Sequence, residues 1–388
     1  MSSRYRPYAY AWEAVYAADF TLDQVRRRAA ALADGLARRN LSCIVAYDTR
    51  FMGGLFARDV AAALQARGLR APVTASPVTL PALHHALDQH LADCALYVSA
   101  SNRPYFYNGL ALLAPDPTGL TLEPPEGADA LAGRPYAAGP FPPTGDQPPD
   151  QSLDLRTGYL EALRAALDLE LIRRTPLTIF VDPMSGTTAG IVPALLGEGG
   201  QTRAIEINRE PDPLFGRLVP SPVEAGLNRL KKLVRESDSH LGLACSADGT
   251  ALAVVDKNGE QLDPAETALL LAAYLARQHR LRGPVVIPAP AAGTPLAGPA
   301  RLSAWEDATG LRIEVAPDPA ARLRELITRD HAPPLLGATD DGQFIISRYA
   351  SYPDAVLAGM ICAEMVARSG GSLRSLIDTQ RDQLLKGG

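Results

Sequence analysis

A serine at the end of an apolar run is the first residue in this sequence that suggests chemistry. In YVSASNRPYFYNG, residues 97–109, an apolar segment over residues 95–98 gives way to small polar residues that begin a loop. A buried strand that ends there would present the hydroxyl of Ser101 at the edge of a sheet, where it can act as a nucleophile. The residues after it, Asn102 and Arg103, add an amide and a positive charge that can bind an anion.

Two further loops place carboxylates between apolar strands. Asp248 lies in the segment SADGT, and Asp340 and Asp341 lie in TDDG. A carboxylate can ligate a hard divalent cation such as Mg²⁺. Two adjacent carboxylates can also accept hydrogen bonds from sugar hydroxyls. These loops are therefore candidate metal-binding and sugar-binding sites.

Each of these features also has a simple structural interpretation. Ser101 is of a type common in strand-to-loop turns, and Asn108-Gly109 is typical of a structural turn. Asp248-Gly249 and Asp340-Asp341-Gly342 each resemble a tight turn between two strands. Arg103 is either solvated or paired with an acidic neighbour. Both interpretations are kept for every candidate.

The elements that must position these loops alternate between strand and helix patterns. Segments such as LSCIVAYDTR and CALYVSAS predict buried strands, and GLFARDVAAALQARG between them predicts a helix. This alternation predicts an α/β fold with largely parallel sheets covered on both faces. A Pro- and Gly-rich stretch over residues 115–153 indicates a linker. The expected domains are residues 1–150, 151–256 and 257–388.

The composition narrows the class of protein. Of 388 residues, 47% are hydrophobic and 21% charged, the profile of a soluble globular chain. The net charge of −5 and the lack of a basic run argue against nucleic acid. No apolar stretch is as long as a membrane span or resembles a signal peptide. The four cysteines lack metal-site spacing, and three of them lie in apolar stretches, as buried free thiols usually do. A reducing cytoplasm is the expected location.

Taken in order, the motifs make this chain resemble the α-D-phosphohexomutases, the phosphoglucomutase/phosphomannomutase family. The matching segments are YDTRF, SASNRP with YNG, VDPMSG, INREPDPLFG, SADGT and GATDDG. The resemblance implies consecutive phosphohexomutase-type α/β/α domains with mixed, mostly parallel sheets. It also implies a phosphoserine loop at 99–104, a metal loop at 246–251 and a sugar loop at 337–342. Within YDTRF, we interpret Asp48 and Arg50 as framework residues that fix the loop by hydrogen bonds.

The phosphoserine loop keeps its serine but not its neighbours. Ser101 occupies the nucleophile position of the family, whereas Asn102 and Arg103 replace a His and an Asn. Near the N-terminus, a family arginine that contacts phosphate falls on Glu13, which reverses the charge. Asn102 cannot carry a proton at neutral pH, so the family's acid–base group is missing.

The metal loop departs further from the family. Its three aspartates fall on Ser246, Asp248 and Thr250, so one carboxylate is left. Mg²⁺ prefers several anionic oxygens, and a lone aspartate would hold it weakly. We expect no cofactor, or at most weakly bound Mg²⁺ at Asp248.

The sugar loop and the C-terminal clamp are altered as well. The two glutamates of the sugar loop fall on Thr339 and Asp340, and its serine falls on Asp341. The fourth domain of the family carries an R-x-S-G-T motif, which this sequence lacks, so domain IV is expected to be absent. The chain is therefore expected to be a pseudoenzyme: a degenerate phosphohexomutase that serves as a binding, scaffold or regulatory subunit.

Two enzymatic alternatives stay open. One is altered chemistry on a sugar phosphate or related anion, using the groups that survive in the three loops. The other is a residual mutase that borrows the missing clamp from a partner chain. For the scaffold role we expect a protein partner or a homo-oligomer. Its contact surface would include the Tyr-rich N-terminus and the C-terminal segment with Leu373, Ile377 and Leu384.

Overall fold

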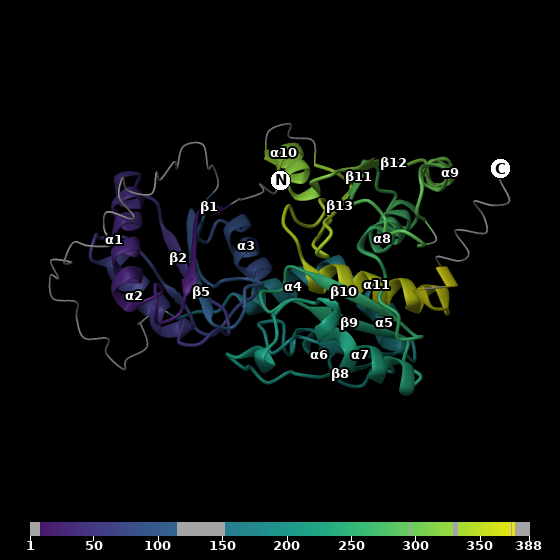
Figure 1. Ribbon diagram of the computed structural model, residues 1–388, viewed down its shortest axis with the longest axis horizontal. Helices are drawn as coiled ribbons and strands as arrows, with labels where there is room; N and C mark the ends of the chain where they lie inside the picture. The colour runs from purple at the N-terminus through teal and green to yellow at the C-terminus, as the bar shows by residue number, and fades with distance from the viewer. Residues whose placement is uncertain (1–7, 115–151, 295, 329–332, 374, 377–388) are drawn as a thin grey trace.

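The strands of this protein form three sheets that follow one another along the chain (Figure 1). The computed structural model describes residues 8–114, 152–294, 296–328, 333–373 and 375–376. Parallel pairs outnumber antiparallel ones, and helices cover both faces of each sheet. The expected α/β class with mixed, mostly parallel sheets is therefore confirmed.

The first sheet carries the Ser101 loop. Its strand order is β1-β5-β4-β2-β3-β6, with α1 and α2 packed on one face and α3 on the other. The elements are β1 (Tyr8–Val15), α1 (Leu22–Arg38), β2 (Cys43–Tyr47), α2 (Gly53–Gln65), β3 (Val73–Thr74), α3 (Leu80–Asp88), β4 (Cys94–Val98), β5 (Tyr107–Leu113) and β6 (Ser152–Leu153).

The second and third sheets each have four strands. Their orders are β10-β9-β7-β8 and β12-β11-β13-β14. The second includes α4 (Arg156–Ala166), α5 (Leu169–Arg174), β7 (Thr178–Asp182), α6 (Ile191–Leu196), β8 (Arg203–Glu206), the 3₁₀ turn η2 (Phe215–Arg217), α7 (Glu224–Glu236), β9 (Leu241–Cys245) and β10 (Leu252–Asp256). The third includes α8 (Pro264–Gln278), β11 (Pro284–Ile287), α9 (Pro299–Thr309), β12 (Arg312–Val315), α10 (Pro319–Thr328), β13 (Leu336–Ala338), β14 (Phe344–Ile345) and α11 (Ala355–Ser369).

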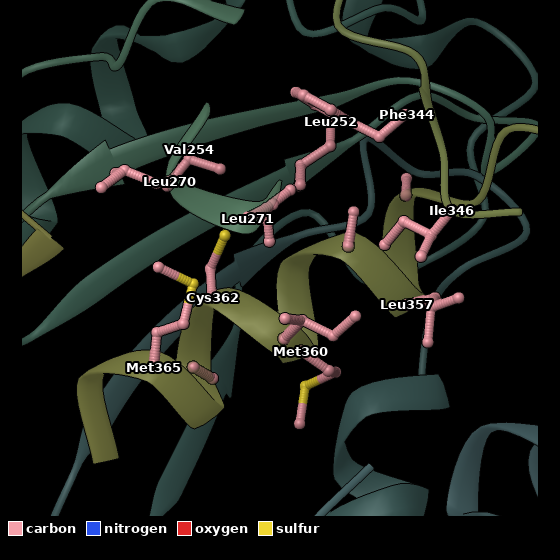
Figure 2. Close-up of a cluster of buried hydrophobic side chains, with 14 of the residues drawn as sticks. Leu252, Val254, Leu270, Leu271, Phe344, Ile346, Leu357, Met360, Cys362 and Met365 are labelled. Atoms are coloured by element: carbon pink, nitrogen blue, oxygen red, sulfur yellow. The ribbon is translucent and has the colours of Figure 1, made fainter. Parts of the chain in front are cut away.

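One hydrophobic core joins the second and third sheets. Helix α11, almost wholly buried, packs on α5, α8, β9 and β10 and so belongs to both units. Figure 2 shows Leu252 and Val254 of β10 and Leu270 and Leu271 of α8 close to the side chains of α11. The first sheet has cores of its own. The last two units are therefore packed as one body, and the first meets them through its loops and through α3, whose Ala82 belongs to their core.

Several helices begin at the side chains that cap them. Thr21, Thr79, Asp168, Asp263 and Asp354 each accept a hydrogen bond from a backbone N–H of the helix that follows. Such caps satisfy donors that a helix start would otherwise leave free. The periodicity of residues 159–174 predicts a single helix, which the cap at Asp168 contradicts. The segment YLEALRAALDLELIRR forms two helices, because the chain turns at residues 167–168 and α5 starts afresh.

The Asn108-Gly109 pair is not a turn. Both residues lie inside β5, where Asn108 pairs with Ala14 and Gly109 with Glu13 of β1. A Cβ on Gly109 would lie 2.3 Å from the carbonyl oxygen of Ser99. The glycine is therefore required by the close approach of neighbouring backbone, and its turn-like sequence is overridden by strand pairing.

The aromatic residues of the N-terminal strand pack inside the first unit. Trp12 stacks on Phe20 at 5.0 Å and lies under the guanidinium of Arg28 at 4.1 Å. Tyr16 packs edge-on against Phe51 at 5.4 Å. Trp12 and Tyr16 are partly exposed, so most of each ring is used within the first unit and less of it remains for the contact surface that the sequence predicts. The side chains of Tyr5 and Tyr8 lie outside the described residues.

The expected contact surface at the C-terminus is also changed. Leu373 is buried, and Leu376 packs against the core shared by the last two units. Ile377 and Leu384 lie outside the described residues. All four cysteines are buried free thiols, one more than the three that the apolar stretches indicated. Within the described part of the chain, no helix combines the length and apolarity needed to cross a bilayer.

A buried carboxyl group sits where the three units meet. Asp354 caps α11 and accepts hydrogen bonds at 2.8 and 3.0 Å from the hydroxyl of Tyr159 on α4. Next to it, Tyr352 stacks on His84 of α3, with ring centroids 4.7 Å apart. Burial raises the pKa of Asp354 to about 6, although the hydrogen bonds that it accepts lower it.

We predict that the Asp354→Asn variant gains stability relative to the natural chain as pH rises from 4 to 7. The folded-state pKa of Asp354 lies above the free value of 3.8, so its contribution to stability is fully present below pH 4. That contribution is lost as pH rises through 6. Asn keeps the cap and the acceptor for Tyr159 without a buried charge, so the gain should reach about 2–3 kcal/mol. Urea unfolding at pH 4, 5.5 and 7 measures it, and a pH-independent difference would contradict the assignment.

Candidate functional site

Arg50 holds the Ser101 loop by its backbone. The guanidinium is almost wholly buried and donates hydrogen bonds to the carbonyl oxygens of Ser101 at 2.8 Å, Arg103 at 2.6 Å, Pro104 at 3.0 Å and Tyr107 at 2.9 Å. Four carbonyls on one planar donor fix the course of the loop. The interpretation of Arg50 as a framework residue is confirmed.

Asp48 links the two strands from which the site extends. It follows β2, and its carboxylate accepts a hydrogen bond at 2.6 Å from Ser99 Oγ, which follows β4. It also accepts one from the backbone N–H of Arg50 at 2.9 Å and lies 3.3 Å from Arg50 Nε, an ion pair rather than an aligned hydrogen bond. Burial raises the pKa of Asp48, partly offset by Arg50, while the nearby carboxylate of Asp248 raises it further. Asp48 is thus a framework residue as well.

Ser101 reaches across to the second unit. Its backbone has φ of 46°, in the left-handed region that is uncommon for a residue with a side chain. Its N–H donates to Ser99 Oγ at 2.9 Å, and its own Oγ donates to Asp248 Oδ2 at 2.5 Å. Ser101 therefore both closes the strand-to-loop turn and makes a direct contact between two candidate loops.

The carboxylate of Asp248 is surrounded by hydroxyls and backbone amides. Its Oδ1 accepts hydrogen bonds from Ser246 Oγ at 2.7 Å and from Thr250 Oγ1 at 2.8 Å and N–H at 3.1 Å. The Ser246 oxygen accepts in turn from the N–H of Ala251 at 2.9 Å. All of these groups are buried. In the described residues, no three His, Cys, Asp or Glu side chains form a group that could hold a metal ion.

Backbone bonds tie this loop to all three units. Gly249 forms the expected tight turn, with φ of 81° and a hydrogen bond from its N–H to the carbonyl of Ser246. The carbonyl of Asp248 accepts from the N–H of Leu80, at the start of α3, at 2.8 Å. The carbonyl of Gly249 accepts from Ala355, at the start of α11, at 3.0 Å. The 246–251 loop is therefore a rigid junction.

Arg103 is paired rather than solvated. Its Nε donates to Glu13 Oε2 at 2.6 Å, and its guanidinium lies 5.6 Å from the centre of the Tyr107 ring. The hydrogen bond to Glu13 raises the pKa of Arg103 above its usual value. Asn102 is exposed beside it. Glu13, at the position where the resemblance places an arginine, thus neutralises the charge of Arg103.

A hollow of about 40 Å³ lies beside Ser101. Ligand pockets for small molecules usually have volumes of about 300 Å³ or more, so this one cannot enclose a hexose phosphate. Its lining comes from three neighbouring strands and the loop: Ala11, Trp12, Glu13, Tyr97, Ser99, Ser101, Leu110 and Ala111.

The candidate sugar loop is a turn that bonds to itself. Thr339 Oγ1 donates to a carboxylate oxygen of Asp341, and the side chain of Gln343 donates to the other at 3.1 Å. Gly342 has φ of 82° and accepts a hydrogen bond from the N–H of Leu252 at 2.8 Å, so the loop is attached to β10. Asp340 and Asp341 are exposed.

The structure thus brings together some of the expected residues. Ser101 and Asp248 are in contact, whereas the side-chain hydrogen bonds that the structure records for Thr339 and Asp341 stay within their own turn. Sequence reasoning missed the roles of Ser246 and Thr250, which it treated only as lost ligands. The available signal was two hydroxyl residues flanking a single aspartate in an otherwise apolar segment.

Comparison with known families points in one direction. The model described as phosphoglucomutase/phosphomannomutase, alpha/beta/alpha domain I, matches residues 7–130, and the model for domain II of that family matches residues 157–259. A phosphoglucosamine mutase of Serratia proteamaculans is 26% identical over 341 residues, and one of Yersinia pestis is 27% identical over 333. Each alignment covers 86% of this chain and 71% of the relative.

Solved structures show the same fold. A Thermus thermophilus protein named as a phosphomannomutase matches with a TM-score of 0.79 at 24% identity, over 99% of this chain and 85% of that one. The open form of the Paramecium phosphoglucomutase parafusin matches with a TM-score of 0.74 at 12% identity, over 99% of this chain and 74% of that one.

We predict that Arg50→Lys destabilises the protein by about 3 kcal/mol, because lysine cannot reach four carbonyls and leaves buried acceptors unsatisfied. The matched control is Arg103→Lys, whose exposed ion pair should contribute little. Thermal and urea unfolding of both variants measure the difference. Equal effects of the two substitutions would refute the framework role of Arg50.

Proposed function

Because this chain belongs to the phosphoglucomutase/phosphomannomutase family, we propose that it is a catalytically degenerate member that acts as a binding, scaffold or regulatory subunit. The observation that carries this proposal is the environment of Asp248. The one carboxylate left in the loop already accepts hydrogen bonds from Ser101, Ser246 and Thr250. The resemblance assigns the other two metal-binding aspartates to the positions of these last two residues.

The oxygen ligands that this loop offers do not fit Mg²⁺. The ion takes anionic oxygens in a nearly octahedral set, and this loop presents one carboxylate with its lone pairs directed at O–H and N–H donors. Inserting a cation would require Ser101 and Ser246 to give up hydrogen bonds, and the loop itself would still supply a single carboxylate. We therefore propose that the chain works without a metal cofactor.

The charges around Ser101 also argue against binding a phosphate dianion. Arg50 directs its donors to four backbone carbonyls, and Arg103 is paired with Glu13. Asp48 and Asp248 lie nearby and are buried. A phosphate at this place would meet carboxylates before any free cation, which disfavours the transfer of a phosphoryl group.

One observation favours the enzymatic alternative. The hydroxyl of Ser101 is 2.5 Å from a buried carboxylate and sits in strained backbone, an arrangement in which an adjacent base can activate a nucleophile. In that case Asp248 would accept the proton of Ser101 during attack on a sugar phosphate or related anion. A dependence of turnover on Ser101 separates this alternative from the scaffold role.

A scaffold needs a partner, and we propose a protein partner or a second copy of the chain. Exposed apolar side chains on one segment of the second unit support this: Ile205, Leu214, Leu218, Val219 and Val223 are each 40–51% exposed. The last four of these side chains lie within ten residues of one another in the chain, and exposed apolar side chains of this kind can form part of a protein contact surface. The buried free thiols support a reducing cytoplasmic location within the same proposal.

We predict that the natural chain binds no Mn²⁺ or Mg²⁺ at this loop, whereas the variant S246D/T250D binds one equivalent of Mn²⁺. The two added carboxylates complete an anionic oxygen set with Asp248. Mn²⁺ titration followed by electron paramagnetic resonance measures binding directly. At one hundred times the dissociation constant, the ion should also stabilise the variant by about 2.7 kcal/mol.

The control is the same variant with Asp248→Asn added, which should lose the site. The natural chain should also show no turnover of glucose 1-phosphate, mannose 1-phosphate or glucosamine 1-phosphate with Mg²⁺ and a bisphosphate activator. Turnover that Ser101→Ala abolishes would reject the degenerate-enzyme proposal and favour the alternative.

We also predict that the purified protein has a mass above that of a monomer in light scattering at micromolar concentration, or co-purifies with a partner. Leu214→Ser with Leu218→Ser should weaken that association, since both side chains lie in the exposed segment. The matched control is Leu91→Ser, at a side chain 55% exposed elsewhere. A monomer without a co-purifying protein would remove the support for the scaffold role.

A further inference from the structure

Two of the four cysteines are neighbours on adjacent strands. Cys43 is the first residue of β2 and Cys94 the first of β4, and the two are register partners in the parallel ladder. Both are wholly buried in the core that α1 and α2 form with the first sheet. Register partners on parallel strands direct their side chains to the same face, so the two thiols face one core together.

The spacing of the two residues suits a covalent bond. Adjacent strands in a sheet are about 4.8 Å apart, and disulfides join residues whose Cα atoms are about 4.4–6.8 Å apart. The effect of Cys94 on the pKa of Cys43 is consistent with this short distance. Burial raises the pKa of the Cys43 thiol well above its usual value, and the neighbouring Cys94 thiol raises it further.

The residues that precede the two cysteines in the chain reach the surface. Ser42 and Asp93, which precede the two cysteines, are partly or fully exposed. The Asp93 carboxylate accepts hydrogen bonds from Ser42 Oγ at 2.7 Å and Ser42 N–H at 2.8 Å, and the Asp93 N–H donates to Ser42 Oγ at 3.1 Å. This Ser42–Asp93 clamp joins the amino ends of the two strands next to the cysteine pair.

We propose that Cys43 and Cys94 form a dithiol modification site that hydrogen peroxide converts to a cross-strand disulfide. One thiol, as its thiolate, attacks a peroxide oxygen and becomes a sulfenic acid while hydroxide leaves. The second thiolate then attacks the sulfenic sulfur, forms the S–S bond and releases a second hydroxide. The two protons lost by the thiols neutralise both hydroxides, so two thiols and one peroxide yield one disulfide and two waters.

The burial that raises the pKa of the Cys43 thiol also limits the rate of the oxidation. Thiolates are the reactive form, and buried apolar surroundings disfavour them. Reaction therefore proceeds when the Ser42–Asp93 clamp opens and water reaches the amino ends of β2 and β4. Its rate should rise when that clamp is weakened, without any change in the thiols themselves.

The pair lies on the two strands that hold the candidate site. At their other ends, β2 leads into Asp48 and Arg50, and β4 leads into Ser99 and Ser101. A disulfide would join these strands covalently at one end, and the Asp48–Ser99 hydrogen bond joins them at the other. This inference is independent of the proposed function, since it rests on the first sheet alone.

The remaining two cysteines provide internal controls. Cys245 pairs in its ladder with Leu252, and Cys362 lies within α11. Both are buried free thiols, and neither has a cysteine as its register partner. Cys245 and Cys362 are as buried as the proposed pair, but neither lies opposite another cysteine on an adjacent strand.

The test is to treat the folded full-length protein with hydrogen peroxide and follow its intact mass. We expect a loss of about 2 Da, the two hydrogens of one disulfide, and peptide mapping that assigns it to Cys43 and Cys94 with Cys245 and Cys362 still free. Cys43→Ser should show no such loss. Asp93→Ala should form the disulfide about five- to thirty-fold faster, as expected when one or two kcal/mol of local stability is lost.

Three results would overturn the proposal. The first is a disulfide that maps to another pair, and the second is oxidation of all four thiols at equal rates. The third is a pair that stays reduced in both the natural chain and Asp93→Ala. Circular dichroism of Asp93→Ala before oxidation shows whether the variant is folded. If it is not, the disulfide yield in the natural chain alone decides between the outcomes.

Discussion

The four hydrogen bonds from Arg50 to backbone carbonyls are the constraint on which the candidate site depends. Loop carbonyls drawn into the interior need donors, and a single buried guanidinium supplies them to residues 101, 103, 104 and 107. The same guanidinium lies 5.2 Å from the ring centre of Phe215 in the second unit. Arg50 thus fixes the backbone of the Ser101 loop and also contributes to the contact between units, so the position of the Ser101 hydroxyl follows from it.

The 246–251 loop meets a second constraint, which is the burial of the Asp248 carboxylate. A buried charge is costly unless it is hydrogen-bonded or paired. Here Ser246 and Thr250 donate to Asp248 from within the loop, and Ser101 donates from the first unit. The Asp248 carboxylate is therefore satisfied by hydrogen bonds from two units. Its backbone also accepts hydrogen bonds from the starts of α3 and α11, which makes it the place where all three units are held in register.

The arrangement of the cores explains why the units meet in this way. Helix α11 and β10 share one core with α8, so the second and third units are packed as one body. The first unit adds contacts from its loops and from α3, among them the hydrogen bond of Ser101 and the stacking of His84 on Tyr352. Such contacts are directional and fix orientation, whereas apolar burial supplies most of the stability. Both the loop held by Arg50 and the 246–251 loop lie where the first unit meets the other two.

The sequence by itself determined the local features of this protein. The alternation of apolar runs with helical periodicity predicts the three α/β units, and Asp48 and Arg50 in YDTRF, which are separated by one residue, indicate a framework loop. Asp248-Gly249 and Asp341-Gly342 predict turns that the structure contains, because the glycines there have positive φ. These features depend on residues close together in the chain, where periodicity and turn chemistry act.

Tertiary structure alone decided the long-range contacts. Asn108-Gly109 has the sequence of a turn but forms part of β5, because pairing with β1 on one side and β4 on the other overrides the local preference. Ser101 meets Asp248 across 147 residues, and Arg103 meets Glu13 across 90. No local pattern encodes either contact, because the first joins loops of two different units and the second joins β1 to the loop between β4 and β5 of the same sheet. The chemistry of the candidate site lies in those contacts, which is why its residues could be named from the sequence and their partners could not.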